Sequence, residues 1–279
     1  MAAVDVQNSR FEVGVFGIAP GKPYDIVLID RYDIRKSLRE DADGDHEWVK
    51  PGSYLEDWDL LIGNVLQKTY PLSDGSGRQM AIKLTVCDSG GKEGVTTNAY
   101  NFYRRLRTLG LAPRFHLVKG DSSPNAPRVK INYPDSNRKD RFAGARGDVP
   151  VLMINPNMLK DSLNGFLDCA IPGEGMYRIP DWVPNHIYKE LCAEQRDKKT
   201  SKWLNPRGSR NETWDLSYYT LAACASPLLA VEKVDWEKPP SWLDEWHKNP
   251  MILAADAEEP FAPKTKPAYS FAELAKAIG

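Results

Sequence analysis

The sequence lacks several patterns that would place it in a common functional class. Its four cysteines are widely spaced and form no C-x-x-C pair, which argues against a zinc site and is typical of reduced thiols in a cytosolic protein. No run of about 18 apolar residues occurs, so the sequence predicts no membrane-spanning helix. The N-terminal residues also lack the basic and apolar regions that are typical of a secretion signal.

An excess of positive charge and a nucleotide-binding loop are also missing. The formal net charge is −1, so any nucleic-acid surface must come from local clustering of basic residues. The segment from Asp88 to Lys92 has the two glycines of a phosphate-binding loop, but Glu93 follows the lysine and the pattern G-x-x-x-x-G-K-[ST] is absent. We therefore expect no ATP binding by this chain alone.

The pattern of apolar and turn-forming residues predicts an α/β fold. Residues 3–34 have the alternation of a three-stranded antiparallel meander with a turn at Pro20–Pro23. Further along, the pattern predicts a helix at 53–69 with a Ser53–Glu56 capping box, a strand at 80–88, a helix at 95–109 and a strand at 114–120. This order of elements is that of a ribonuclease-H-like core, a mixed central sheet flanked by helices.

The rest of the chain is expected to contribute fewer core elements. We expect a polar, acidic loop at 35–52, a strand at 149–155, a helix at 156–167, a hairpin at 171–180, and helices at 184–195 and 211–225. The ribonuclease-H-like domain would then span 1–226, followed by a peripheral Pro- and Trp-rich tail at 227–279. Because the first strand begins so close to Met1, we expect the chain to be part of a longer protein.

Acidic residues stand at three places where these elements should bring them together. Asp5 lies inside a strand, Asp88 ends another, and Glu212 and Asp215 are three residues apart on one face of a helix. A buried carboxylate is costly unless it is paired or binds a cation, and Mg²⁺ prefers oxygen ligands. The pattern therefore predicts a site for one or two Mg²⁺ or Mn²⁺ ions. A turn cap at Asp88 and ordinary first-turn acids in the helix remain alternatives.

Basic residues supply further candidates. Lys119 ends a strand, where it could contact a phosphate or position a water, and Lys160 could do the same; an ordinary surface lysine is the alternative for both. Residues 120–148 are rich in Pro, Gly, Ser and Asn and predict an exposed, mobile basic insertion that binds DNA, with a solvated loop as the alternative. The basic residues from 119 to 146 are Lys119, Arg128, Lys130, Arg138, Lys139, Arg141 and Arg146.

The ordered set of short motifs resembles the C-terminal nuclease domain of the large terminase subunit of lambda-like tailed phages. The motifs are VDVQNSRFEVGVFGIAPG, CDSGG, VKG, PGEGMYRIP, YKELCAE and RNETWD, and they cover roughly residues 1–225. The resemblance implies an RNase-H-like, Mg²⁺- or Mn²⁺-dependent endonuclease that cuts concatemeric viral DNA during packaging in the host cell cytoplasm. It also implies double-stranded DNA, the small terminase subunit, the terminase ATPase domain and the portal protein as partners.

Carried over by motif, the resemblance assigns metal-binding roles to individual residues. Asp5, Asp88 and Glu212 match the metal-holding acids, Asp215 matches the second acid of the last motif, and Lys119 matches the lysine of a K-G pair. Glu212 is thereby favoured over Asp215 as the direct ligand.

The chain departs from the family pattern in two motifs, and two other classes of protein remain open. Arg178 stands where the family often has histidine, and Thr213-Trp214 replaces Ala-Leu between the last two acids. A Holliday-junction resolvase or transposase-type nuclease with the same core is one alternative. A docking module for DNA or the portal, with acids that do not cleave, is the other.

Overall fold

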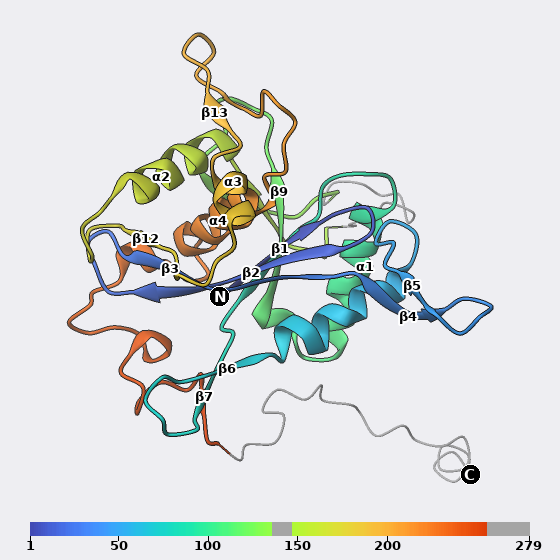
Figure 1. The fold of residues 1–279 in the computed structure, drawn as a ribbon, viewed down its shortest axis with the longest axis horizontal. Helices are drawn as coiled ribbons and strands as arrows, with labels where there is room; N and C mark the ends of the chain where they lie inside the picture. The colour runs from blue at the N-terminus through green and yellow to red at the C-terminus, as the bar shows by residue number, and fades with distance from the viewer. Residues whose placement is uncertain (136–146, 256–279) are drawn as a thin grey trace.

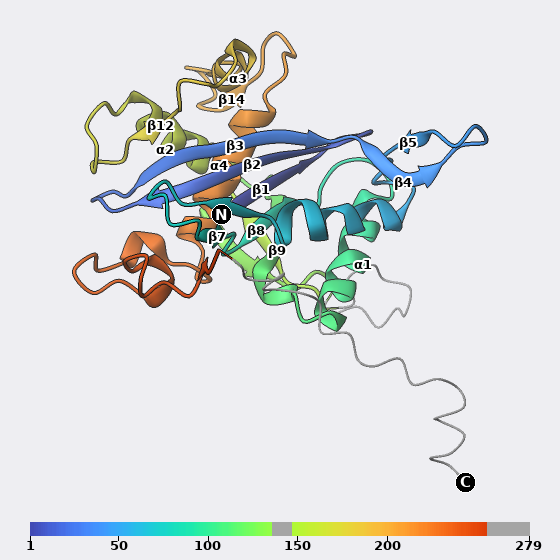
Figure 2. The same ribbon diagram turned by 60° about the horizontal axis from the view of Figure 1, so that its bottom comes forward.

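The computed structural model describes residues 1–135 and 147–255. These residues are organised around a central eight-stranded mixed sheet with the strand order β10-β11-β9-β8-β1-β2-β3-β12 (Figure 1). Helices cover both of its faces, as the turned view makes plain (Figure 2).

One half of the sheet is the predicted meander. It consists of β1 (Ala2–Val6), β2 (Phe11–Ala19) and β3 (Asp25–Ile34), which are antiparallel neighbours. Because side chains alternate between the faces of a strand, Ala3 of β1 packs on one face of the sheet and Ala2 and Val4 on the other. The meander is confirmed.

The other half adds strands parallel to β1. They are β8 (Thr85–Asp88), β9 (Phe115–Gly120) and β11 (Val151–Ile154). Two short strands complete the sheet: β10 (Val129–Asn132) is antiparallel to β11, and β12 (Tyr177–Arg178) is parallel to β3. The carboxyl ends of the parallel strands therefore meet at one edge of the sheet.

Two layers of helices enclose two hydrophobic cores. On one face lie α2 (Pro156–Asp168), α3 (Asn185–Leu191) and α4 (Glu212–Ala225); on the other lie α1 (Val95–Thr108), a 3₁₀ helix η1 (Leu55–Asp59) and a π-helix η2 (Ile62–Leu66). Three further 3₁₀ turns are η3 (Ala112–Arg114), η4 (Val231–Lys233) and η5 (Ser241–Leu243). Helix α4 crosses β1 and β2 and is buried along almost its whole length, which is typical of a central helix.

Helix α4 approaches the sheet closely at Gly14 of β2. A Cβ atom at Gly14 would lie 3.4 Å from the Cβ of Leu216 and only 2.7 Å from the Phe16 ring. Glycine thus leaves room for the helix where it crosses the strand, close to the first turn that carries Glu212 and Asp215.

Several predicted elements differ in the structure. The acidic loop expected at 35–52 contains a hairpin of β4 (Lys36–Glu40) and β5 (His46–Trp48). Asp57 holds this hairpin, because its buried carboxylate accepts hydrogen bonds from Ser37, Arg39 and the backbone N–H of Lys50. The helix expected at 53–69 is a 3₁₀ and a π segment whose first residue has no side-chain cap, so the Ser53–Glu56 capping box was wrong.

The strand expected at 80–88 divides between two sheets. Its first part, β7 (Gln79–Ala81), pairs with β6 (Thr69–Pro71) and β15 (Ile252–Leu253) in a small separate sheet. Alternating apolar residues do not reveal where a chain changes partners, so the sequence signal was the same for both parts. The second part is β8, which carries Asp88.

The hairpin expected at 171–180 was also wrong. Only Tyr177–Arg178 form a strand there, and they pair in parallel with β3. The preceding loop is held by the buried Asp25, whose carboxylate accepts the backbone N–H groups of Gly173, Gly175 and Met176. A single buried side chain thus orders a segment that the sequence pattern assigned to local strand pairing.

Part of the basic segment is ordered as an edge of the central sheet. Strand β10 lies within 120–148, and Val129 and Ile131 pack on the α4-side core. Arg128 pairs with Glu232, whereas Lys130 is exposed. Arg138, Lys139, Arg141 and Arg146 lie outside the described residues.

Residues beyond α4 pack on the main body. Trp236 and Trp242 contact the α4-side core, and β15 joins the small sheet. The domain boundary expected at residue 226 stays a prediction. No helix in the described ranges is long and apolar enough to cross a membrane.

Candidate functional site

Four carboxylates form a row across the face of the sheet that α4 covers. Asp5 is opposite Glu12 in the β1–β2 pair, and Glu12 is opposite Asp33 in the β2–β3 pair. The β1–β8 register, continued by one residue beyond Val4 and Cys87, sets Asp5 beside Asp88. Neighbouring strands are roughly 4.8 Å apart, so each carboxylate is close to the next. From β8 to β3 this acid row is Asp88, Asp5, Glu12 and Asp33.

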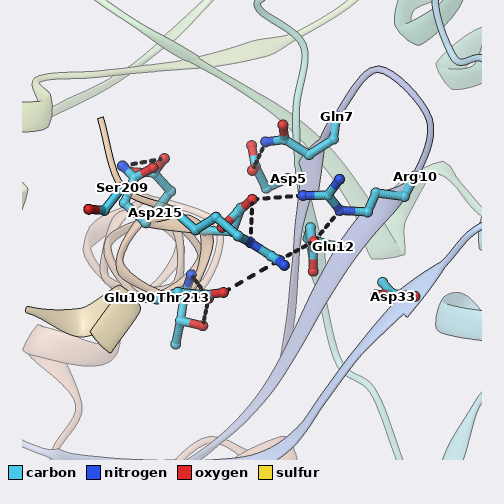
Figure 3. Close-up of polar contacts among 12 residues, drawn as sticks. Asp5, Gln7, Arg10, Glu12, Asp33, Glu190, Ser209, Thr213 and Asp215 are labelled. Carbon is cyan, nitrogen blue, oxygen red and sulfur yellow. Dashed lines mark hydrogen bonds and ion pairs between the residues drawn. The ribbon is translucent and has the colours of Figure 1, made fainter. Parts of the chain in front are cut away.

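Arginines compensate one half of the acid row. Like charges on directly opposite residues destabilise a sheet unless they are neutralised. Glu12 bonds to Arg10 (Figure 3), and it also accepts hydrogen bonds from Arg31 at 2.6 Å and from Arg210 at 2.8 Å. Asp33 pairs with Arg35. This half of the row is therefore a closed ion-pair network.

The other half has no such partners. Asp5 accepts a hydrogen bond from the Gln7 amide at 2.5 Å, and Asp88 accepts one from the backbone N–H of Gly90 at 3.0 Å. Within residues 1–135 and 147–255, no ion pair reaches either carboxylate. Burial, followed by the charge of Asp88, raises the pKa of Asp5 to about 7. Burial also raises the pKa of Asp88, although backbone hydrogen bonds and Lys119 oppose it. Both groups therefore favour a bound proton or cation.

Asp215 adds a third carboxylate from the first turn of α4. Its pKa is raised well above the usual range by burial, which Lys160 opposes and the charges of Asp5 and Asp88 increase. Asn211 donates to Asp215 at 3.2 Å, and the Lys160 Nζ lies 3.8 Å from its other oxygen. Asp215 is thus electrostatically coupled to both uncompensated members of the acid row.

Glu212 belongs to the arginine network. It bonds to Arg10 at 2.8 Å and to Arg210 at 3.1 Å. Burial opposes ionisation of Glu212, but a backbone hydrogen bond and these two guanidiniums outweigh it and lower its pKa. Although Glu212 and Asp215 lie three residues apart, their environments are opposite: one is neutralised, and the other is held beside further carboxylates.

The side chains as they stand do not form a closed metal cage. Among the described residues, no group of three or more His, Cys, Asp or Glu side chains is arranged to hold a metal ion. Asp5, Asp88 and Asp215 nevertheless fit a hard cation chemically. They provide oxygen donors, and their pKa values are raised mainly by burial, which disfavours the ionised form unless a cation is bound.

The two candidate lysines differ in their surroundings. Val118 is paired with Asp88, and Lys119 follows it in the strand. Because side chains alternate between the faces of a strand, Lys119 leaves the sheet on the face that α1 covers, opposite to Asp88. Its charge nonetheless lowers the pKa of Asp88. Lys160 is largely buried and donates to both oxygens of Glu194 at 2.8 Å, close to Asp215. Lys160 is therefore part of the candidate site, not an ordinary surface lysine.

Sequence reasoning missed the residues that hold the first turn of α4. Glu190 of α3 is buried and accepts the backbone N–H of Thr213 at 3.0 Å as well as the Thr213 hydroxyl (Figure 3). Arg31 and Arg210 lie within 3.4 Å of the same carboxylate. Only Glu12 had a usable signal, since it is an acid inside an apolar strand. The arginines come from distant parts of the chain, and no sequence pattern identified them as part of the site.

Comparison with protein families identifies the family of the chain. A family described as terminase large subunit gpA, endonuclease domain, matches residues 1–236. Neither curated proteins nor solved structures give a match. The matched range contains every residue of the acid row and all of α4, and the predicted resemblance is confirmed. Membership implies a nuclease role in DNA packaging. The chain belongs to the family of terminase large subunit gpA endonuclease domains.

Proposed function

We propose that this chain is a divalent-metal-dependent endonuclease that cuts concatemeric viral DNA during genome packaging. The family supports a nuclease role. The strand order β3-β2-β1-β8-β9, with an antiparallel meander followed by two parallel strands, supports an RNase-H-like core. In such a core, acids at the carboxyl ends of the first and fourth strands and on a following helix lie together.

The observation that carries the proposal is the uncompensated half of the acid row. Asp5 and Asp88 lie side by side with raised pKa values, and Asp215 joins them from α4. We propose that these three carboxylates hold one or two Mg²⁺ or Mn²⁺ ions. A bound ion would supply a nucleophile from water and stabilise the leaving oxygen of the phosphodiester.

The other residues of the site act on these carboxylates. Gln7 orients Asp5, the backbone N–H of Gly90 holds Asp88, and Lys160 partly offsets the charge of Asp215. We rank Asp215 ahead of Glu212 as a direct ligand, since two arginines occupy Glu212. Lys119, at the same edge of the sheet, is proposed to contact the phosphate.

The remaining parts of the packaging machinery are proposed as partners. Double-stranded DNA is the substrate, and the small terminase subunit, the ATPase domain and the portal protein would supply site selection and force in the host cell cytoplasm. Phosphate contacts give affinity without sequence information, so we expect the isolated chain to cut weakly, with little sequence preference and strong salt dependence. Lys119, Arg128, Lys130 and the four basic residues outside the described ranges remain proposed DNA contacts.

Plasmid nicking in Mn²⁺ tests the proposal. The wild type should convert supercoiled DNA to nicked and linear forms, and Asp5→Asn and Asp88→Asn should not. Asp33→Asn is the matched control, because Asp33 belongs to the same acid row but pairs with Arg35. A wild type that never cuts, or an Asp88→Asn variant that cuts equally well, would reject the catalytic role. Preference for a cruciform plasmid over a linear duplex would instead favour a resolvase.

A further inference from the structure

A strongly basic hairpin leads directly into the first turn of α4. It spans residues 195–210 and contains β13 (Gln195–Arg196) and β14 (Trp203–Leu204). We call this segment the basic hairpin. In Figure 1 its loop projects beyond α2, α3 and α4. Its basic residues are Arg196, Lys198, Lys199, Lys202, Arg207 and Arg210, and Asp197 is its one acid.

The lysines at the tip of the basic hairpin are exposed and uncompensated. Lys198, Lys199 and Lys202 are exposed, and no ion pair in the described part of the chain involves them. The nearby Asp197 does not neutralise them, because its carboxylate accepts the backbone N–H groups of Lys199 and Thr200 and shapes the turn. Three ammonium groups are therefore free to meet an external anion.

The base of the basic hairpin is fixed to the helices beside the candidate site. The Trp203 indole donates to Asp161 of α2 at 2.8 Å, and the Trp203 backbone N–H donates to Asn157 at 3.1 Å. The Trp203 ring lies 5.0 Å from the ring of Trp214, which stands between Glu212 and Asp215 on α4. The base of the basic hairpin is thus held against α2 and against α4, the helix that carries Asp215.

A cavity extends the same positive surface along the arginine-compensated half of the acid row. Its volume is about 860 Å³, and it is bounded by β3, by α3 and by the second half of the basic hairpin. Asn205 brackets the turn on that side through two hydrogen bonds with Ser209, which sets the place of Arg207. Arg207 and the neighbouring Lys189 of α3 are exposed and have no ion pair in the described residues.

We propose that the basic hairpin, together with Lys189 and Arg207, binds the phosphate backbone of duplex DNA and holds it beside Asp215. The inference rests on the proposed function, because it names the surface that presents DNA to that site. Duplex DNA fits better than an acidic protein, since the free lysines lie on a projecting hairpin (Figure 1) and the cavity beside it is lined by Glu12 and Asp33 of the acid row. A regular row of phosphates meets such a ridge without any side-chain complementarity.

Binding without metal tests this inference separately from cleavage. The affinity of the wild-type chain for a fluorescent 30-base-pair duplex is measured by anisotropy in EDTA between 50 and 200 mM KCl. The test variant is the triple change Lys198→Ala, Lys199→Ala, Lys202→Ala. The matched control removes three exposed lysines from the C-terminal segment, Lys233→Ala, Lys238→Ala and Lys248→Ala, for the same change in net charge. A third variant replaces the hairpin lysines with arginine.

The hairpin variant should bind on the order of tenfold more weakly at 50 mM KCl, and its salt slope should fall by about 0.9 for each phosphate that the variant no longer neutralises. The arginine variant should keep the affinity and the slope of the wild type, and the control should keep the slope. Equal binding by the hairpin and control variants, or no binding by the wild type, overturns the inference. If the chain binds DNA through the hairpin but never cuts it, the inference stands and the nuclease proposal is rejected. If the chain cuts DNA and the hairpin variant binds as tightly as the wild type, the nuclease proposal stands and the inference is rejected.

Discussion

Asp5 and Glu12 lie opposite each other on β1 and β2, yet only Glu12 is neutralised by arginines. The two carboxylates are close neighbours on one face of the sheet, so their difference comes from what approaches them from other elements. Arg31 from β3 and Arg210 from the basic hairpin reach Glu12. Asp5 faces Asp88 and Asp215 instead, and burial raises its pKa to about 7.

Added metal should stabilise the fold through Asp5 and Asp88. A ligand present at a hundred times its dissociation constant stabilises the folded state by about 2.7 kcal/mol, which corresponds to roughly 5–10 °C in melting temperature for a chain of this size. We expect Mn²⁺ to produce such a rise in the wild type and in Asp33→Asn, but not in Asp88→Asn. Differential scanning fluorimetry measures it, and an equal rise in Asp88→Asn would place the ion elsewhere.

Without metal, stability should fall as the pH rises toward 7. The pKa of Asp5 is 3.8 in the unfolded chain and about 7 in the fold, so the folded state binds more protons between these values. The contribution is fully present below the unfolded pKa and is lost as the pH rises through the folded pKa, with a slope of at most about 1.4 kcal/mol per pH unit. Urea unfolding in EDTA from pH 4.5 to 8 measures it. Asp5→Asn should flatten this dependence, and an unchanged slope in that variant would contradict the assignment.

Asp215 and Glu212 should respond differently to neutralisation. Asp215→Asn removes a proposed ligand, so the Mn²⁺ affinity and the rate of DNA nicking should each fall by about a hundredfold or more, since loss of an outer-shell partner alone costs about 10–100-fold. Glu212→Gln removes one carboxylate from the ion pairs of Arg10 and Arg210, which still contact Glu12, so it should lower the free energy of unfolding by about 1–3 kcal/mol while metal still binds. Isothermal titration with Mn²⁺ separates the two, and loss of metal binding in Glu212→Gln alone would reverse the ranking.

Glu190 should support the site by fixing the first turn of α4. Its buried carboxylate accepts the Thr213 N–H and pairs with Arg31, so Glu190→Ala should lower the free energy of unfolding by about 3–5 kcal/mol. The exposed Glu174→Ala is the control and should stay within about 0.5 kcal/mol of the wild type. Chemical denaturation measures both. Because Glu190→Ala could also fail to fold, Glu190→Gln provides a milder variant, whose wild-type stability would exclude the proposed support.

The sequence pattern located Asp5 and Asp88 correctly on their elements. Asp5 is inside the first strand, Asp88 ends β8, and the meander and α1 have the predicted order. These features depend on alternation and helical spacing, which are local properties of the chain. The strand at 80–88 and the hairpin at 171–180 failed because each depends on which distant segment pairs with it.

The sequence by itself determined the α/β class, the positions of the acids and the family to which the chain belongs, because periodicity and motif order are written along the chain. Only the tertiary structure decided which acids remain uncompensated. Arg10 and Arg210 contact both Glu12 and Glu212, and Arg31 joins them at Glu12. This convergence leaves Asp5, Asp88 and Asp215 as the coupled set. Charge compensation acts over a few ångströms in space, and residues far apart in sequence provide it.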